Sequence, residues 1–231
     1  IDKTVEISSI KGGYSNAIKQ LNKFIDVGYK DYAKFSSDPS KEASSQLSPY
    51  FHFGQISTHE VFEKLSKIEN WSLESIDPKM VGRREGWWGS SENFESFMDE
   101  LITWRELGYH TCVRRANYNQ YSSLPEWAIK TLQEHSSDER EHIYSLDELT
   151  YSQTHDEIWN AAQNQLRTQG IIQNYLRMLW GKKILEWTPN PQLALSYMIT
   201  LNDRYSLDGR DPNSYSGVFW VLGRYDRAWG P

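Results

Sequence analysis

Glu100 and Trp104 form the first pair of residues whose types and spacing indicate chemistry. They stand four residues apart in a segment with helical periodicity, so they share one face of the expected helix. A carboxylate beside an aromatic ring on the apolar side of a helix is costly unless it has a function or a partner. The segment therefore predicts either a functional carboxylate at Glu100 or an ion pair with a neighbouring arginine.

Trp180 and Trp187 form a second pair, seven residues apart on one expected helix. A rise of about 1.5 Å per residue places them roughly 10 Å apart along the axis and on the same face. This spacing suits stepwise electron transfer between indoles, and it suits ordinary helix packing equally well. Arg177 precedes Trp180 by three residues and needs a carboxylate if it is buried. Asp208, in the turn after Leu207, is the candidate partner.

The segment SSQLSPY (44–50) places hydroxyl groups just before an expected helix start. Such a loop can bind phosphate through the unpaired backbone N–H groups of the first turn and through hydroxyl donors. Simple capping of the helix is the alternative explanation.

Self-contained catalytic sets are missing from the sequence. No His, Asp and Glu residues have the spacing of a metal site, so we expect no metal, and no nucleophile elbow occurs. The His155-Asp156 pair resembles a helix start capped by Thr154 or Asp156. We therefore expect any chemistry to belong to a bound cofactor.

The elements that must position these residues are helices. Apolar residues recur at helical spacing, and Ser57 with Glu60 has the pattern of a capping box. The expected helices cover residues 14–34, 91–115, 155–169, 171–187 and 191–205, with two more that start near Ser57 and at Pro125.

Signals for β-strands are poor, and Gly12-Gly13 is an isolated pair outside any dinucleotide-binding pattern. Polar or Gly-rich connections are expected at 36–48, 81–91 and 207–216. The sequence thus predicts an all-α fold over residues 1–231, which could form two helical lobes, at about 1–90 and 91–231.

Composition narrows the class of protein further. The 231 residues include ten Trp and one cysteine, Cys112, so no internal disulfide framework or cysteine-based metal site is possible. No apolar run is long enough to span a bilayer, and the first residues show no signal segment. The net charge of −6 argues weakly against general polyanion binding. We expect an intracellular protein, cytoplasmic in a bacterial-type cell or nuclear in a eukaryote, with no membrane partner.

Six segments in order resemble the photolyase/cryptochrome family, from about Tyr14 onward. They are LSPYFHFGQIS (47–57), FMDELITWREL (97–107), THDEIWNAAQ (154–163), LRMLWGKKILEW (176–187), LNDRYSLDGRDPNSYSG (201–217) and DRAWG (226–230). Class II cyclobutane pyrimidine dimer photolyases are resembled most by three of these stretches, THDEIWNAAQ, WGKKILEW and LDGRDPN.

The resemblance implies an FAD-binding helical domain that acts as a deoxyribodipyrimidine photo-lyase, a carbon–carbon lyase that repairs DNA by electron transfer from reduced FAD. Asn202 matches the residue that faces flavin N5. The positions that match cofactor-binding residues are Tyr32, Ser45, Leu47, Ser48, Arg177, Asn202, Leu207 and Asp208.

The resemblance also implies a lesion pocket and a chain of electron donors. Glu100 matches the carboxylate that binds the dimer, with Trp104 and Met178 beside it. The positions implied to contact DNA are Trp104, Trp220, Trp229 and Arg227. Trp159, Trp180 and Trp187 match the photoreduction chain, with Trp180 nearest the flavin. A damaged pair costs less to extrude from the duplex, and aromatic walls can then receive it.

Some positions depart from the family pattern. The amino-terminal α/β antenna domain is absent, so no antenna chromophore is expected in this chain. Gln173-Asn174, Leu179 and Ser36-Ser37 replace residues that relatives often carry. Two alternatives stay open: a cryptochrome-like flavin photoreceptor without repair activity, and a flavin- or nucleic-acid-binding module without photochemistry.

Overall fold

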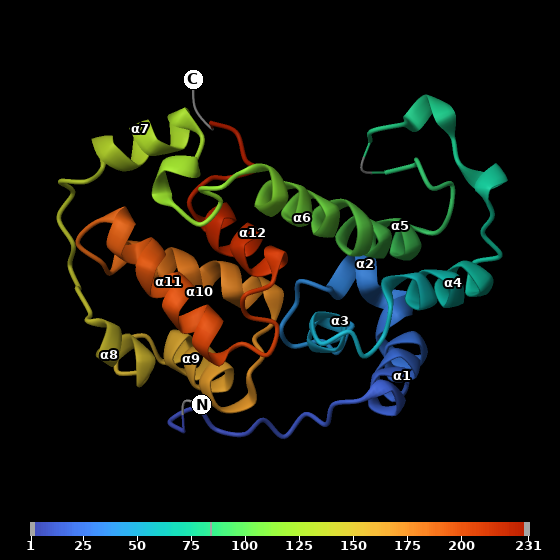
Figure 1. Ribbon diagram of the computed structural model, residues 1–231, viewed down its shortest axis with the longest axis horizontal. Helices are drawn as coiled ribbons and strands as arrows, with labels where there is room; N and C mark the ends of the chain where they lie inside the picture. The colour runs from blue at the N-terminus through green and yellow to red at the C-terminus, as the bar shows by residue number, and fades with distance from the viewer. Residues whose placement is uncertain (1–2, 84, 229–231) are drawn as a thin grey trace. The chain divides into compact units, whose positions relative to one another are not determined.

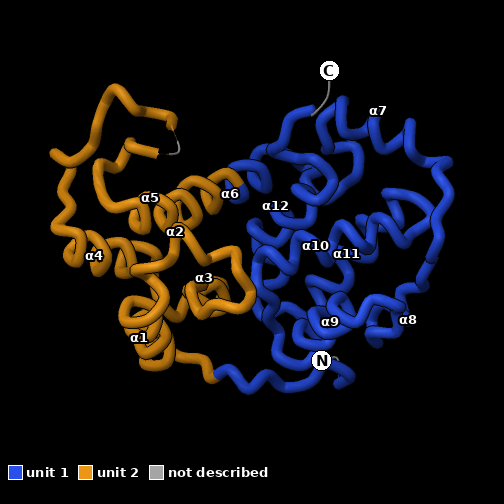
Figure 2. The backbone as a smooth tube through the Cα atoms, turned by 180° about the vertical axis from the view of Figure 1, so that it is seen from behind, with its two compact units in different colours: residues 1–10, 108–231 blue, residues 11–107 orange. Residues whose placement is uncertain are grey.

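The computed structural model describes residues 3–83 and 85–228, and every regular element in these ranges is helical (Figure 1). No strand occurs among these residues, which confirms the all-α class that periodicity predicts. Figure 2 shows two compact units: residues 11–107 form unit 2, and residues 1–10 and 108–231 form unit 1.

Unit 2 is built from short helices joined by irregular turns. Its helices are α1 (Tyr14–Lys23), α2 (Tyr32–Phe35), α3 (Ser48–His52), α4 (Thr58–Ile68), α5 (Glu92–Met98) and the start of α6 (Arg105–Arg114). Two π-helical turns occur at Phe24–Gly28 and Asp99–Trp104, and 3-10 turns occur at Tyr29–Asp31, Leu73–Ser75 and Pro78–Met80.

The core of unit 2 follows from the apolar stripe of α1. Leu21 is fully buried, and the ring of Phe24 packs against Phe97 of α5 with centroids 5.1 Å apart. Tyr32 completes this group, edge-on to both Phe24 and Phe97. The long expected helix from residue 14 is interrupted by the π-turn that ends at Gly28. A Cβ atom on Gly28 would lie 2.7 Å from the carbonyl oxygen of Glu42, so only glycine permits this close approach.

Unit 1 packs its longest helices around one core. Its elements are the rest of α6, a 3-10 turn (Tyr121–Ser123), α7 (Glu126–Glu134), α8 (Leu146–Thr150), α9 (Glu157–Gln169), α10 (Asn174–Glu186), α11 (Pro191–Tyr205) and α12 (Pro212–Val221). The fully buried side chains of this core include Ile184, Met198, Leu201 and Phe219. Burial of such side chains stabilises the unit by about 1.5–3 kcal/mol each.

Capping side chains fix where the helices of unit 1 begin. The side chains of Asp156, Gln173, Asn190 and Asp211 accept hydrogen bonds from the first turns of α9, α10, α11 and α12. Asp156 is therefore the cap of α9, one of the two candidates that the sequence offers. The expected connection at 207–216 is wrong in its second half, because Asp211 and Pro212 start α12 there.

The helix starts of unit 2 also follow sequence signals. Ser57 accepts a hydrogen bond from the backbone N–H of Glu60 at 3.1 Å, which is half of the predicted capping box. The Glu60 carboxylate instead accepts from the Tyr14 hydroxyl at 2.6 Å.

The division between the units differs from the boundary near residues 90 and 91 that the polar connection suggests. It falls between Leu107 and Gly108, inside α6, and the first ten residues belong to unit 1. The physical reason is that α5 carries Phe94 and Phe97, which pack into the core of unit 2.

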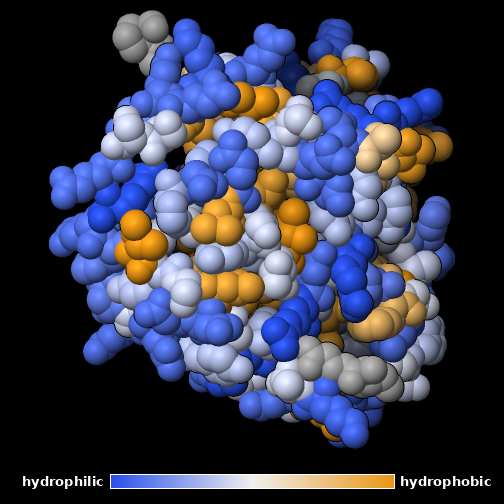
Figure 3. Space-filling view, turned by 60° about the vertical axis from the view of Figure 1, so that its left-hand side comes forward, coloured by the Kyte–Doolittle hydropathy of each residue, from blue (hydrophilic) through white to orange (hydrophobic). Residues whose placement is uncertain are grey.

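Surface properties agree with the composition. On the face shown in Figure 3, hydrophilic residues predominate and hydrophobic side chains lie in small separate patches. None of the described helices has the length and apolar character that a membrane span requires.

Candidate functional site

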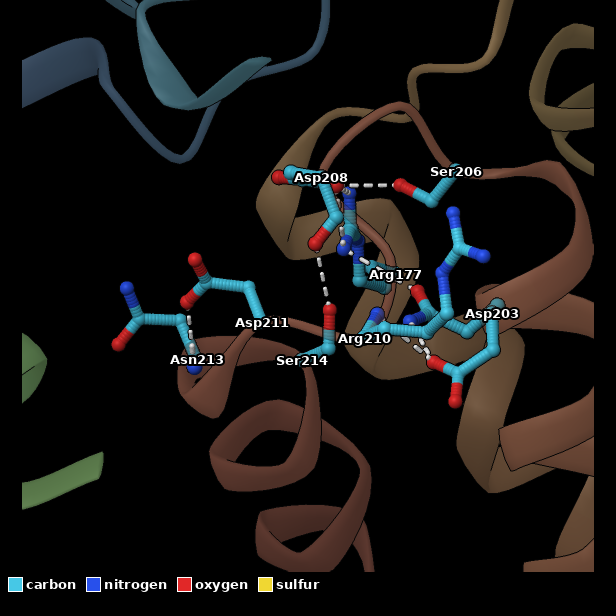
Figure 4. Close-up of polar contacts among 9 residues, drawn as sticks. Arg177, Asp203, Ser206, Asp208, Arg210, Asp211, Asn213 and Ser214 are labelled. Atoms are coloured by element: carbon cyan, nitrogen blue, oxygen red, sulfur yellow. Dashed lines mark hydrogen bonds and ion pairs between the residues drawn. The ribbon is translucent and has the colours of Figure 1, made fainter. Parts of the chain in front are cut away.

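Arg177, Asn202 and Asp208 form a polar cluster in unit 1, contributed by α10, α11 and the turn that follows α11 (Figure 4). Nη1 of Arg177 donates to Oδ1 of Asn202 at 3.2 Å, and Nη2 lies 3.5 Å from Oδ1 of Asp208. Asn202 is only 1% exposed, and the side chains of Arg177 and Asp208 are 17% and 18% exposed. Asp208, which the sequence predicts as the partner of Arg177, is therefore its ion-pair partner in the structure.

Serine hydroxyls hold the Asp208 turn in place. Ser206 donates its hydroxyl to the Asp208 carboxylate, and Ser214 of α12 donates to the Asp208 carbonyl oxygen at 2.8 Å (Figure 4). Gly209 lets the turn pass close to α11, since its Cβ would lie 2.8 Å from the carbonyl oxygen of Asn202. The carboxylate thus has a fixed orientation beside the guanidinium.

Asp203 ties the same turn to α12. It accepts from the backbone N–H of Arg210 at 3.0 Å and from the Tyr215 hydroxyl at 3.1 Å. Burial, followed by the Asp203 charge, raises the pKa of Tyr215 well above its ordinary value. The Tyr215 hydroxyl therefore keeps its proton, and its hydrogen bond to Asp203, to a higher pH than an ordinary tyrosine would.

Trp180, Trp159 and Trp187 form one continuous aromatic series in unit 1. The rings of Trp159 and Trp180 are parallel with centroids 6.5 Å apart, and those of Trp159 and Trp187 meet edge-on at 5.5 Å. All three are at most 3% exposed. The sequence suggests neighbouring positions for Trp180 and Trp187, and the structure inserts Trp159 of α9 between them.

Hydrogen bonds fix the planes of these indoles. Nε1 of Trp180 donates to Oε1 of Gln163 at 2.8 Å, and Nε1 of Trp159 donates to the carbonyl oxygen of Trp180 at 3.1 Å. Gln163 is fully buried and was not singled out from the sequence. Its position four residues after Trp159 on α9 is the signal that could have identified it.

A group of polar aromatic side chains, also missed by the sequence, adjoins Trp187. Tyr144 and His155 pack edge-on against Trp187 with centroids 5.5 and 5.3 Å away. The ring of His142 lies over His155 with centroids 3.9 Å apart. Only the tertiary structure joins these residues, which stand in the loop before α8 and just before α9.

Glu100 and Trp104 lie in the π-turn at Asp99–Trp104 of unit 2, where Glu100 is exposed and Trp104 is half-buried. The expectation that Glu100 lies on the apolar side is wrong: its side chain is exposed, and the neighbouring Asp99 is buried instead. The wider π-turn shifts which residues face the core. Nε1 of Trp104 donates to Oδ2 of Asp99 at 3.0 Å, and the ion pair of this segment joins Arg105 to Glu106 at 2.6 Å.

Tyr32, a predicted cofactor residue of unit 2, has a buried side chain. Burial raises its pKa well above the ordinary value, and the charges of Glu100 and Asp99 add to this effect. Edge-on contacts with Phe24 and Phe97 hold its ring at the start of α2.

The other three predicted residues of unit 2 lie at the start of α3, with Ser45 and Leu47 in the preceding loop and Ser48 as the first helical residue. Leu47 is fully buried, whereas Ser45 is half-buried and Ser48 is exposed. The N-cap residue Leu47 has no side-chain cap for helix α3, and the Ser45 hydroxyl accepts from the backbone N–H of Leu47 at 3.4 Å. The carbonyl oxygen of Ser45 accepts from Nε2 of Gln20 at 2.9 Å, which anchors the loop to α1.

The remaining predicted residues belong to unit 1. Met178 is half-buried, and its methyl group lies near Gly217 of α12. Leu207 donates its backbone N–H to the carbonyl oxygen of Gly170 at 2.8 Å. Trp220 is 37% exposed, with its ring 6.5 Å from that of Tyr225, and Arg227 is exposed. Trp229 lies outside the described residues.

Metal coordination finds no support in the part of the chain that the structure describes. No group of three or more His, Cys, Asp and Glu side chains in residues 3–83 and 85–228 could hold an ion. The single cysteine, Cys112, has a pKa raised by burial.

Comparison of the sequence with curated proteins gives relatives of one kind. The chain is 40% identical over 225 residues to a deoxyribodipyrimidine photo-lyase of Methanothermobacter thermautotrophicus, covering 97% of this chain and 45% of the relative. It is 37% identical to the protein of that name from Potorous tridactylus, covering 99% of this chain and 40% of the relative. The chain thus spans less than half the length of these relatives.

Comparison with solved structures shows a similar fold. The crystal structure of a Synechocystis cryptochrome matches with a TM-score of 0.67 at 14% identity, covering 97% of this chain and 42% of that one. No protein-family model matches the sequence.

Proposed function

We propose, because this chain belongs to the photolyase/cryptochrome family, that it forms the flavin-binding part of a light-driven DNA-repair enzyme. The reaction is the splitting of cyclobutane pyrimidine dimers, with the class II enzymes as the nearest branch. The observation that carries this proposal is the buried series Trp180, Trp159 and Trp187 beside the polar cluster of Arg177, Asn202 and Asp208.

The polar cluster of unit 1 fits the polar edge of a flavin ring. Arg177 bonds to Asn202 through Nη1 and to Asp208 through Nη2. A guanidinium has five N–H donors, so Arg177 can also donate to a ligand. Asn202 offers a carboxamide held at a buried position, and Asp208 balances the guanidinium charge. A bound FAD would supply light-driven one-electron chemistry.

The residues of unit 2 are proposed to bind the diphosphate and adenosine side of FAD. Ser45 and Ser48 offer hydroxyl groups next to the first turn of α3, which lacks a capping side chain. Backbone N–H groups at a helix start favour an anion such as a diphosphate. Tyr32 and Leu47 provide a rigid apolar floor because both are buried.

The tryptophan series is proposed to supply electrons during photoreduction. Edge and stacking contacts at 5.5 and 6.5 Å between centroids leave no gap in the series. Trp180 is at the end of the series and lies on α10, the helix that also carries Arg177. Its hydrogen bond to Gln163 fixes the orientation of this indole. Trp180 is therefore the proposed first donor to the flavin.

The lesion is proposed to contact Glu100, Trp104, Met178 and Trp220. The exposure of Glu100 suits a carboxylate that meets a ligand from outside the protein. In its protonated form, the carboxyl group of Glu100 would donate an O–H hydrogen bond that stabilises the negative charge developing on the pyrimidine. Half-exposed Trp104 and Trp220 offer ring faces for a base flipped out of the duplex.

Affinity for DNA is proposed to come mainly from phosphate contacts by Arg and Lys, with Arg227 among them. Such contacts release counterions, so binding should weaken as salt increases. An intracellular location follows from the proposed substrate.

The deciding experiment measures flavin and repair together. The purified protein, loaded with FAD, is reduced and given blue light with an oligonucleotide that carries one thymine dimer. Flavin absorption bands with recovery of intact thymines are the expected result. Flavin bands without repair would favour the cryptochrome-like photoreceptor, and failure to bind FAD would reject both functions.

A further inference from the structure

A cavity of about 220 Å³ lies on unit 1, lined by the end of α7, the loop after it, the last turns of α10 and the start of α11. Figure 1 shows that the connection from α7 to α8 runs past the turn between α10 and α11. The backbone N–H of Tyr144 in this connection donates to the carbonyl oxygen of Trp187 at 3.1 Å, which holds the two segments together.

The walls of this cavity are largely apolar. Leu132 of α7, Leu185 of α10 and Pro191 of α11 line it, and both leucines pack against the core of unit 1. An apolar cavity of about 150 Å³ can hold benzene, whereas sites for drug-sized ligands begin at about 300 Å³. The cavity therefore has room for one apolar group of the size of a single ring.

Two cations of the same cavity, Arg140 and Lys182, lack a carboxylate partner. Arg140 is half-buried and Lys182 is exposed, and no ion pair of the described residues includes either of them. Nε of Arg140 is buried without a hydrogen-bond partner among those residues, and Nη2 reaches only the carbonyl oxygen of His135, at 3.4 Å. A buried N–H without an acceptor costs free energy, so a ligand that supplies an acceptor is favoured here.

The other titratable side chains of the cavity already have partners. Glu186 is the one carboxylate among the described residues of the lining, and its two oxygens lie 3.2 and 2.9 Å from Nζ of Lys183. Nδ1 of His135 lies 2.8 Å from Oδ2 of Asp138. The excess charge at the cavity is therefore positive and comes from the guanidinium and the ammonium group described above.

We propose that this cavity binds a small aromatic acid, in which a carboxylate is joined to a single apolar ring. The planar fork of Arg140 matches a carboxylate, which accepts parallel hydrogen bonds from Nε and from one terminal nitrogen. Lys182 adds an ion pair, and the ring fills the space between Leu132, Leu185 and Pro191. The site is independent of the proposed flavin chemistry, because its lining includes no residue of the polar cluster or of the tryptophan series.

The test is a titration of the full chain with phenylacetate, followed through the methyl NMR signals of Leu132 and Leu185. Phenylacetamide has the same ring without the charge and is the matched ligand. Lys182→Gln and Arg140→Gln each remove one cation. Lys182 is exposed, so its variant keeps the fold whether or not the Arg140 variant does. Lys130→Gln is the control, because Lys130 is also exposed and is paired with Glu134 on α7.

Phenylacetate should shift both methyl signals to saturation. Phenylacetamide should bind about tenfold or more weakly, as the loss of a charged hydrogen-bond acceptor implies. Lys182→Gln should weaken phenylacetate binding by about two- to fivefold, the usual contribution of an exposed ion pair, and Lys130→Gln should leave it unchanged. Arg140→Gln should weaken it by about tenfold or more.

Three results would overturn the proposal. The first is the absence of a saturable shift of either methyl signal in wild type. The second is equal affinity for phenylacetate and phenylacetamide, which would mean that the cations do not recognise the ligand. The third is a phenylacetate affinity in Lys182→Gln equal to that in Lys130→Gln.

Discussion

The indole rings of Trp159 and Trp180 lie parallel, with an interplanar angle of 0° and centroids 6.5 Å apart, although 21 residues separate them in the chain. The hydrogen bond from Nε1 of Trp159 to the carbonyl oxygen of Trp180 holds this arrangement. A buried indole N–H usually needs such a partner. The pair is therefore fixed by polar contacts as well as by packing, as the proposed electron transfer would require.

Replacement of Trp180 by Phe should interrupt photoreduction. The Phe ring fills much of the space, but it is far harder to oxidise and cannot bond to Gln163. Photoreduction of oxidised FAD should slow strongly, while repair by chemically pre-reduced protein should continue. Flash photolysis measures the first rate, with Trp127→Phe of α7 as the control. Equal photoreduction rates in the variant and wild type would show that electrons arrive by another path.

Replacement of Glu100 by Ala should lower the repair yield and leave FAD binding intact. The side chain is exposed, so its loss should change the free energy of unfolding by less than about 0.5 kcal/mol. Repair of a thymine-dimer oligonucleotide per absorbed photon is the measurement. Glu106→Ala, also exposed and six residues further along, is the matched control. Unchanged repair by the Glu100 variant would remove this carboxylate from the mechanism.

Removal of the Arg177 side chain should weaken FAD binding. Arg177→Met keeps the aliphatic length but leaves Asn202 and Asp208 without the guanidinium. Loss of a charged hydrogen-bond partner costs about 1.5–3 kcal/mol, which corresponds to an affinity lower by about tenfold or more. Titration of the apoprotein with FAD measures this change, and Arg204→Met, whose guanidinium bonds to Thr4, serves as the control. Equal FAD affinities for the two variants would show that Arg177 does not contribute to FAD binding.

Removal of the cap of α9 should destabilise unit 1. Asp156→Ala deprives the backbone N–H of Trp159 of its acceptor at 2.9 Å, and such losses cost about 0.5–2 kcal/mol. Asp156→Asn should restore most of the stability, because Asn caps helices equally well. Urea unfolding followed by circular dichroism compares the three proteins. If Asp156→Ala were as stable as wild type, the cap would contribute nothing and packing alone would determine where α9 begins.

Alkaline pH should reveal the buried hydroxyl of Tyr29. Burial, reinforced by its 2.7 Å hydrogen bond to Glu69, raises the pKa of Tyr29 well above the ordinary value of 10. A raised pKa in the folded state means that the stabilisation is complete below about pH 10 and decreases as the pH rises from there, because only the unfolded chain ionises.

The matching measurement compares urea unfolding of wild type and Tyr29→Phe at pH 8 and pH 11. Between these values wild type should lose up to about 1.4 kcal/mol more than the variant, since one pH unit above the unfolded pKa corresponds to this amount. The other tyrosines titrate in both proteins and cancel in the difference. Equal losses would mean that Tyr29 ionises in the folded protein.

Local signals in the sequence determined the secondary structure and much of the residue inventory. Helical periodicity, together with Ser57, Asp156 and Pro191 at helix starts, gives the all-α class because these effects act within one turn of the chain. The pairing of Arg177 with Asp208 was predictable for a similar reason, since a half-buried guanidinium needs a nearby carboxylate. The six motif segments and their order pointed to the family.

Only the tertiary structure decided which of these residues meet and which face water. The π-turn at Asp99–Trp104 exposes Glu100 and buries Asp99, because helix widening depends on packing against the rest of the unit rather than on spacing. The packing of α9 on α10 inserts Trp159 between Trp180 and Trp187, and the loop before α8 brings Tyr144 to His155. Periodicity reports one helix at a time, whereas these contacts join segments that only the folded core holds together.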